Sequence, residues 1–336
     1  MKILEIKPLE PLSLSLSPIG GIDIFTVTHS TPIPLPTTVA GALGASMNVK
    51  PLSSDPIDSL IELIRELGKI CGAVEDPIVL GPLTCLEKQI TDASKCYTYI
   101  YPKGLVSLSL CSIDIRGKIV YLNLDKCKGD EERYIDFTPL TMVGVSLQRT
   151  GPGEDKTVRY GYMYRYPLTI YRTSSGKVVN PVYIYRFNCG KDVNTITRFG
   201  GESRVAKLVT RDVEADYLKN IRTPLKKLEK GLYISLSPIP MIPLKSNVTR
   251  LNPETVELPI PMNSVIGIPQ KDSPPKIKID RLGLGFSEVV ERRRPEILAL
   301  PPGTAIMIEE DRASTTFSDL MKGLLSIGFA SLYKLG

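Results

Sequence analysis

Histidine is almost absent from this sequence, since His29 is the only one among 336 residues. A Ser/His/Asp triad, a catalytic pair of histidines or an HExxH metal site cannot be built from one imidazole unless another residue type takes its place. His29 precedes a proline-rich turn, where we expect a loop or core residue rather than a catalytic base. The carboxylates are scattered without the spacing of a metal site, and no nucleotide-binding glycine motif is complete. The sequence therefore predicts a protein without catalytic residues, metal or cofactor.

Closely spaced cysteines and long hydrophobic runs are also missing. The six cysteines are all ten or more residues apart, which excludes a CxxC zinc half-site or redox pair. We expect buried thiols, with one or two disulfides as the alternative, because disulfides do occur inside hyperthermophile cells. No run approaches the roughly 20 apolar residues that cross a bilayer, and the start of the chain lacks the layout of a signal peptide. We therefore expect a cytoplasmic protein without a membrane partner.

Positive charge and tyrosine are concentrated in the middle of the chain. Residues 145–211 carry 12 Lys and Arg against 4 Asp and Glu, and they hold seven of the 15 tyrosines. This mixture is typical of single-stranded nucleic-acid binding, because cations neutralise phosphates while aromatic rings stack on unpaired bases. A tyrosine-rich sheet with a solvated basic face explains the composition equally well.

Alternating and β-branched segments predict more strands than helices, and hence an α+β fold. The one clear helix begins after Asp55, an N-cap residue followed by proline, and ends at Gly68 or Gly72. The segment Gly151–Asp155 predicts the tip of a long hairpin. Proline clusters predict long surface loops, of which the longest covers residues 252–278. Strands are expected at residues 12–18, 105–115, 118–124, 144–149, 160–171 and 181–188.

A short repeat favours two related halves. Leu-Ser-Leu-Ser-Pro-Ile at residues 14–19 reappears as Ile-Ser-Leu-Ser-Pro-Ile at residues 234–239. The length of the chain and its hydrophobic content of 42% also suit two globular domains. We expect an N-terminal domain at residues 1–222 and a C-terminal domain at residues 223–336.

The first candidate site is a helix start that is rich in small residues, within residues 34–45. We expect Thr37 or Thr38 to cap this helix, whose unpaired N–H groups attract phosphate, while Gly41 lets a backbone approach closely. A capped helix that packs tightly on a sheet is the alternative interpretation.

The second candidate is the long hairpin. Arg149 and Thr150 lead into its tip, and strand alternation places Arg159 and Arg165 on one face and Tyr164 on the other. One face could then bind phosphate while the other stacks or packs, although a purely structural hairpin fits the pattern as well.

The third candidate is the turn Arg198-Phe-Gly-Gly-Glu-Ser-Arg204. Gly200 and Gly201 expose backbone amides, and the flanking arginines present guanidinium groups that suit a phosphodiester backbone. The run Arg292–Arg294 is the densest basic cluster of the chain, and we interpret it as a solvated charge run.

The order of these pieces resembles that of the RAMP superfamily of CRISPR proteins. The resemblance spans essentially the whole chain, and it is strongest to the Cas-five-like subunit of type III-B (Cmr) effector complexes. The glycine-rich loop near the C-terminus, which contains Gly323 and Gly328, has wider glycine spacing than the usual G-x-G-x-G of this family. The motif residues are Pro34, Pro36, Thr37, Thr38, Gly41, Leu43, Gly144, Arg149, Thr150, Gly161, Tyr164, Gly200, Gly201, Glu202, Arg204, Arg294, Pro295, Pro302, Gly303, Thr304, Gly323 and Gly328.

The resemblance implies two ferredoxin-like (RRM-like, βαββαβ) domains with a protruding β-hairpin thumb at about residues 144–166. It also implies a non-catalytic subunit that holds the 5′ handle of the guide crRNA. The expected neighbours are the large polymerase/cyclase-like subunit and a backbone RAMP subunit, with target RNA met only indirectly. A guide-processing endoribonuclease and a protein-only adaptor are the alternatives. The residues expected to contact RNA are Thr37, Thr38, Gly41, Arg149, Thr150, Arg159, Tyr164, Arg165, Gly200, Gly201, Ser203 and Arg204.

Overall fold

The structure is a computed structural model. It describes residues 1–15, 30–86, 95–102, 104–107, 113–116, 119–122, 134–149, 156–173, 175–201, 203–244, 254–270, 273–287, 289, 291–312 and 316–335. His29 and Thr150 therefore lie outside the described residues. None of the helices in the described part of the chain has the length and apolar character needed to cross a bilayer.

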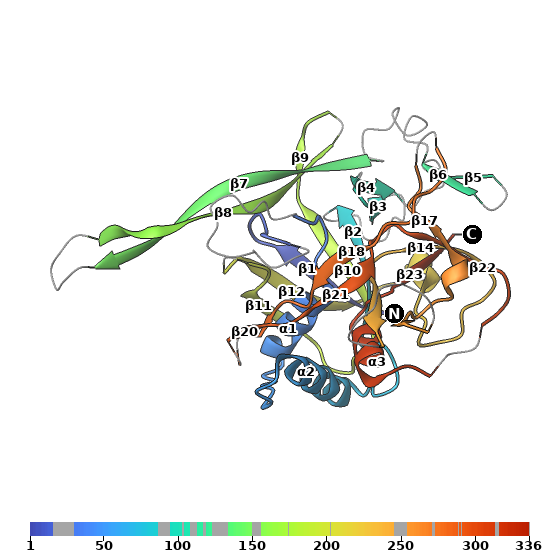
Figure 1. Ribbon diagram of the computed structural model, residues 1–336, viewed down its shortest axis with the longest axis horizontal. Helices are drawn as coiled ribbons and strands as arrows, with labels where there is room; N and C mark the ends of the chain where they lie inside the picture. The colour runs from blue at the N-terminus through green and yellow to red at the C-terminus, as the bar shows by residue number, and fades with distance from the viewer. Residues whose placement is uncertain are drawn as a thin grey trace.

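Antiparallel strands dominate the fold, which confirms the expected α+β class (Figure 1). The largest sheet has ten strands in the order β11-β12-β1-β10-β2-β3-β4-β7-β8-β9. Its strands are β1 (Lys2–Pro8), β2 (Val79–Leu86), β3 (Cys96–Ile100), β4 (Gly104–Ser107), β7 (Tyr134–Arg149), β8 (Lys156–Thr173), β9 (Val178–Val179), β10 (Pro181–Phe187), β11 (Asn194–Arg198) and β12 (Val205–Asp212).

The C-terminal part of the chain forms smaller sheets. A five-stranded sheet has the order β13-β23-β14-β22-β17, and a four-stranded sheet has the order β16-β15-β21-β18. Their strands are β13 (Ile221–Arg222), β14 (Gly231–Ser235), β15 (Ile239–Pro243), β16 (Val256–Glu257), β17 (Val265–Gly267), β18 (Asp280–Gly283), β21 (Glu296–Leu300), β22 (Ala305–Ile308) and β23 (Leu332–Leu335). Two-stranded ladders join β5 (Ile113–Arg116) to β6 (Ile119–Leu122) and β19 (Phe286–Ser287) to β20 (Arg292–Arg293). The proline-rich stretch expected as a loop thus contributes β16 and β17.

In the described residues three α-helices accompany the sheets: α1 (Pro36–Ser46), α2 (Pro56–Cys71) and α3 (Asp319–Ser326). Helix α2 confirms its sequence signals, because the Asp55 carboxylate accepts hydrogen bonds from the backbone N–H groups of Ile57 and Asp58 at 2.8 and 3.0 Å. Gly72 ends the helix with φ +69°, a left-handed conformation that glycine adopts without steric cost.

We expected Thr37 or Thr38 to cap helix α1, and this prediction was wrong. Its N-cap is Leu35, which makes no side-chain cap hydrogen bond, and Pro36 occupies the first turn. Proline favours the first helical position because its φ is already helical and it has no N–H to leave unpaired. The helix therefore starts before the threonines, and both of them lie in its first turn.

The opening strand was expected at residues 12–18, whereas the structure places it at β1. This strand lies between β12 and β10, with Leu4, Glu5 and Ile6 all buried. A strand that is covered on both faces loses the alternation that marks a half-buried strand. Residues 11–15 form only isolated bridges, which pair Ser13 with Gly201 and Ser15 with Ser30.

The sheets pack against each other through shared hydrophobic clusters. Ile3 and Ile184 of the largest sheet share one cluster with Leu232 and Ile234 of the five-stranded sheet. A second cluster joins residues of α1 and α2 to residues of β18 and α3. The five-stranded sheet includes β13 and thus begins slightly before the boundary that the sequence suggested.

Four of the six cysteines form disulfides. Cys71 at the end of α2 bonds to Cys189, 118 residues later in the chain, and Cys85 of β2 bonds to Cys96 of β3. The structure thus favours the alternative of disulfides over buried thiols for these four residues. Cys111 and Cys127 lie outside the described residues.

Three of the tyrosines in the basic stretch belong to the interior of the largest sheet. Tyr171, Tyr183 and Tyr185 are 5% exposed or less. The hydroxyl of Tyr171 donates to the carbonyl of Pro32 at 2.6 Å and lies 2.6 Å from the hydroxyl of Tyr183. Burial raises the pKa of all three hydroxyls. For these residues the sheet interpretation of the tyrosine pattern is correct.

Candidate nucleic-acid interface

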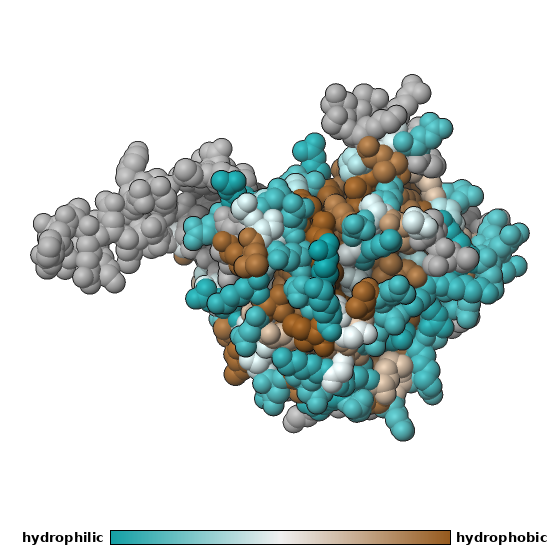
Figure 2. Space-filling view, turned by 90° about the horizontal axis from the view of Figure 1, so that it is seen from below, coloured by the Kyte–Doolittle hydropathy of each residue, from teal (hydrophilic) through white to brown (hydrophobic). Residues whose placement is uncertain are grey.

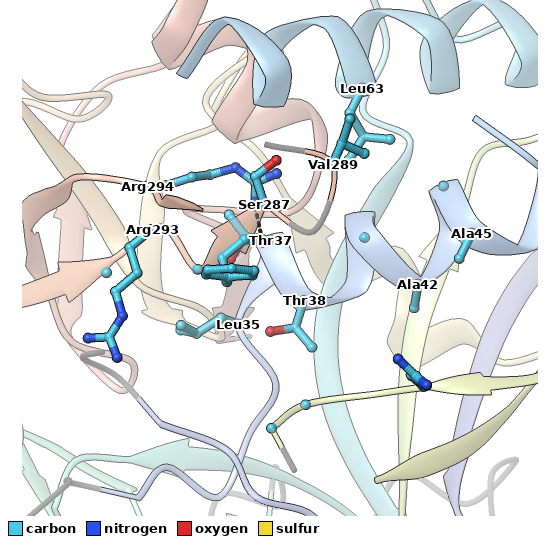
Figure 3. A pocket seen from close by; sticks show the side chains of 18 of the residues that line it. Leu35, Thr37, Thr38, Ala42, Ala45, Leu63, Ser287, Val289, Arg293 and Arg294 are labelled. Carbon is cyan, nitrogen blue, oxygen red and sulfur yellow. Dashed lines mark hydrogen bonds between the residues drawn. The ribbon is translucent and has the colours of Figure 1, made fainter. Parts of the chain in front are cut away.

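A groove with a volume of about 650 Å³ lies between α1, the Gly200-Gly201 turn and the segment that carries β19 and β20 (Figure 3). Thr37, Thr38 and Gly41 line it together with both glycines of the turn. The fold therefore brings together residues of two candidate sites that lie about 160 positions apart in the sequence.

One wall of the groove is the small-residue face of α1. Thr38 is half-buried, while Gly41 and Ala45 are exposed. A Cβ atom added at Gly41 would meet no atom within 4 Å, so the space above this position is open. Figure 3 shows Thr38, Ala42 and Ala45 along this helix. An extended ligand could approach the helix backbone closely here.

The facing wall is the glycine turn. Gly200 has φ +82°, and a Cβ atom there would lie 2.7 Å from the carbonyl oxygen of Ser13. The N–H of Gly201 donates to that same oxygen at 2.9 Å. Only glycine fits at position 200, since any side chain would clash with this backbone. Arg198 precedes the turn, is exposed and lines the groove.

Arg204 follows the glycine turn but is not among the residues that line the groove. Its guanidinium forms an ion pair with Glu10, and Nη2 lies 3.5 Å from the hydroxyl of Tyr166 on β8 of the hairpin. The hydrogen bond to Glu10 is the main cause of a raised pKa for Arg204. Its RNA contact stays a prediction, and its observed contacts tie the turn to the hairpin. Ser203 is exposed on the same turn with φ +56°.

Four further predicted residues belong to the strands of the hairpin. Arg149 ends β7, whereas Arg159, Tyr164 and Arg165 belong to β8, with Tyr164 opposite Gly144 in the ladder. Figure 1 shows β7 and β8 leaving the rest of the molecule as a long two-stranded arm. The β7–β8 ladder runs from the pair Ile135–Thr173 to the pair Arg149–Lys156, so the strand pairing extends beyond the thumb predicted at about residues 144–166.

The sequence does not predict that Arg293 and Arg294 line the groove, because the run Arg292–Arg294 is interpreted as a solvated charge run. Both line the groove, and Figure 3 shows their side chains projecting in different directions. Arg294 is 9% exposed, and its guanidinium donates to the carbonyls of Pro56 at 3.3 Å and Phe286 at 3.0 Å. Burial lowers the pKa of Arg294. The density of arginine in this run was the available signal.

The chemistry of the groove favours an anion. Its charged lining residues in the described part of the chain are Arg198, Arg293 and Arg294, with no carboxylate, histidine or cysteine among the lining residues. The described residues also contain no group of three or more His, Cys, Asp or Glu that could hold a metal ion. Guanidinium groups and an accessible helix backbone suit the phosphodiester backbone of a nucleic acid.

The chain is similar to a subunit of a CRISPR complex. No family model matches the chain. The CRISPR system CMR subunit Cmr3 of Saccharolobus solfataricus is 26% identical over 326 residues, which covers 91% of this chain and 86% of that protein.

Solved structures share the fold along the full length. A chain in a cryo-EM structure of the Type III-B Cmr-beta bound to cognate target RNA matches with a TM-score of 0.61 and 21% identity, covering 100% of this chain and 97% of the other. The same assembly with target RNA and AMPPnP gives a TM-score of 0.59 at 19% identity, covering 100% and 99%. The chain is thus similar over most of its length to Cmr3, and it shares its fold with the matched chains of the Cmr-beta assembly.

Proposed function

We propose that the chain is a non-catalytic RNA-binding subunit of a type III-B Cmr effector complex. In this role the groove holds the 5′ handle of the guide crRNA, and the chain docks on the large polymerase/cyclase-like subunit beside a backbone RAMP subunit. The observation that carries the proposal is a groove whose charged residues, among those described, are all arginines, beside an open helix face at Gly41. The similarity to Cmr3 supports the same assignment.

The strand orders support two ferredoxin-like units at about residues 1–222 and 223–336. In the first, α1 and α2 connect β1 to β2, and β10 lies between these strands with antiparallel pairing. In the second, α3 connects β22 to β23, and β14 lies between them in the same way. This split βαβ arrangement is the one that ferredoxin-like folds use. In the described residues the other crossover is built from strands, β11 in the first unit and β15 and β16 in the second.

The protruding hairpin is the proposed thumb. Arg204 links Tyr166 of β8 to the glycine turn, so a strand that leaves the groove on that side would meet the hairpin. We propose that the hairpin wedges into the guide near the end of the handle, with Arg149, Arg159 and Arg165 as its basic residues. Target RNA would then be met only through the guide.

The test is a footprint of the guide RNA in the assembled complex, with wild-type chain and with Gly41→Glu. A carboxylate at position 41 would face the phosphates at close range, so we expect loss of handle protection and at least a roughly tenfold weaker affinity. Gly190→Glu is the matched control, because Gly190 is exposed, has equally open space around its Cβ and lies outside the groove.

Two results would contradict the proposal. One is a handle that stays unprotected in the wild-type complex, and the other is an unchanged footprint and affinity for Gly41→Glu. Recovery of cut repeat RNA after incubation with the purified chain would instead favour an endoribonuclease.

A further inference from the structure

Phe286 is a large aromatic residue that stays open to solvent at the groove. It is 53% exposed, and it lines the cavity. Burial of a phenylalanine is strongly favourable, so an exposed ring forgoes stabilisation that the fold could otherwise obtain. A ring exposed in a basic groove is therefore a candidate contact for a ligand.

The backbone beneath this ring is held in place by buried contacts. The carbonyl of Phe286 accepts a hydrogen bond from Arg294 at 3.0 Å, and Arg294 also donates to the carbonyl of Pro56 at the start of α2. The buried hydroxyl of Ser287 lies 3.3 Å from that of Ser59 on α2. The ring is thus presented from a fixed position and not from a loose loop.

The glycine before Phe286 brings this segment close to α1. Gly285 has φ +87°, and a Cβ atom there would lie 3.7 Å from the Thr37 hydroxyl and 3.8 Å from Nη1 of Arg294. Gly283, Gly285 and Phe286 therefore form part of the wall of the groove. A strand that follows α1 would pass near Phe286.

Basic and apolar side chains line the groove and the hollow next to it. Phe286 pairs with Arg293 across the β19–β20 ladder, and both residues line the groove. Leu52 and Val289, which are 88% and 56% exposed, line a shallow hollow next to the groove together with Arg292. Figure 2 views the molecule from the side of α2 and α3, and it shows apolar residues gathered on this face among hydrophilic ones. An aromatic ring beside arginines is the combination that single-stranded nucleic acids bind, by stacking and by phosphate neutralisation.

We propose that Phe286 and Arg293 form a platform on which one unpaired base of the bound RNA strand stacks. The inference rests on the proposed function, because the strand must lie in the groove for one of its bases to reach the ring. The all-arginine charge of the described lining favours a polyanion over a peptide of mixed charge. Stacking accepts every base, since each has a π-face, and we expect a modest preference for the larger purine ring.

The experiment uses the full chain and a single-stranded RNA with the repeat-derived 5′ end of the guide, in which 2-aminopurine replaces one base at a time. Binding to the wild-type chain should quench the fluorescence at one position more than at its neighbours. Phe286→Ala should abolish this quenching and weaken binding about tenfold, whereas Phe286→Tyr should retain both. Arg293→Ala should reduce the slope of log affinity against log salt by about one.

Ile277→Ala is the matched control, because Ile277 is 61% exposed and lies outside the groove. If Phe286→Ala binds and quenches like the wild type while Gly41→Glu weakens binding, the platform is wrong and the groove assignment stands. If Gly41→Glu also has no effect, the groove itself is not the RNA site and both proposals fail. If Phe286→Ala leaves RNA affinity unchanged but lowers recovery of the chain with its partner subunits, the ring contacts protein, which equally overturns the platform.

Discussion

Substitution by alanine at Gly41 and at Gly44, two glycines of α1, should change the free energy of unfolding in opposite directions. A Cβ at Gly41 meets no atom within 4 Å, so Gly41→Ala keeps only the gain from replacing glycine in a helix interior, about 0.5–1 kcal/mol. A Cβ at Gly44 would lie 2.6 Å from Cδ1 of Leu63 on α2. Leu63 is 5% exposed, so its side chain must shift to admit the methyl group, and overpacking of this kind costs about 1–3 kcal/mol. Gly44→Ala should therefore destabilise the protein.

The assay is urea unfolding of both variants, followed by circular dichroism, with the midpoint as the readout. We expect a higher midpoint for Gly41→Ala and a lower one for Gly44→Ala. In a Leu63→Ala background the clash is removed, so Gly44→Ala should become neutral or stabilising. Equal midpoints for the two single variants, or no change of sign in the Leu63→Ala background, would refute the packing of α1 on α2. Gly41→Ala should also weaken RNA binding by a few fold if the strand approaches this face.

The remaining predictions concern covalent and acid–base properties of the core. Replacing both Cys71 and Cys189 by serine should lower the free energy of unfolding by about 2–4 kcal/mol, because the bond closes a long loop of the unfolded chain. An unchanged urea midpoint for this double variant would argue against the bond. Tyr171 and Tyr183 are buried with raised pKa values, so the folded state favours their protonated hydroxyls. The stabilisation of the folded state by these two hydroxyls is complete below about pH 10. Above that pH the free energy of unfolding falls by up to about 1.4 kcal/mol per pH unit for each tyrosine. The urea midpoint should therefore drop as the pH rises above about 10, and Tyr171→Phe should reduce the drop; an equal drop in that variant would contradict the assignment.

The sequence by itself determined those elements whose start and end depend only on neighbouring residues. Asp55 and the proline after it define the start of α2, and Gly72 defines its end, because capping and left-handed termination depend only on neighbouring residues. The hairpin was predicted from alternation and a glycine-rich tip, although its full length was underestimated. The small-residue helix and the Gly-Gly turn were also visible as separate motifs, as was the order that links them to the RAMP superfamily.

Tertiary structure alone decided how these motifs combine. Gly41 and Gly200 face the same groove because β1 packs between β12 and β10, a pairing that no local pattern encodes. The role of each arginine depends on its partner. Arg204 forms an ion pair with Glu10. Arg294 instead donates to the carbonyl of Pro56 at the start of α2 and forms part of the wall of the groove. Local backbone preferences act over a few residues, while burial and charge pairing depend on which surfaces meet, and those contacts exist only after the chain has folded.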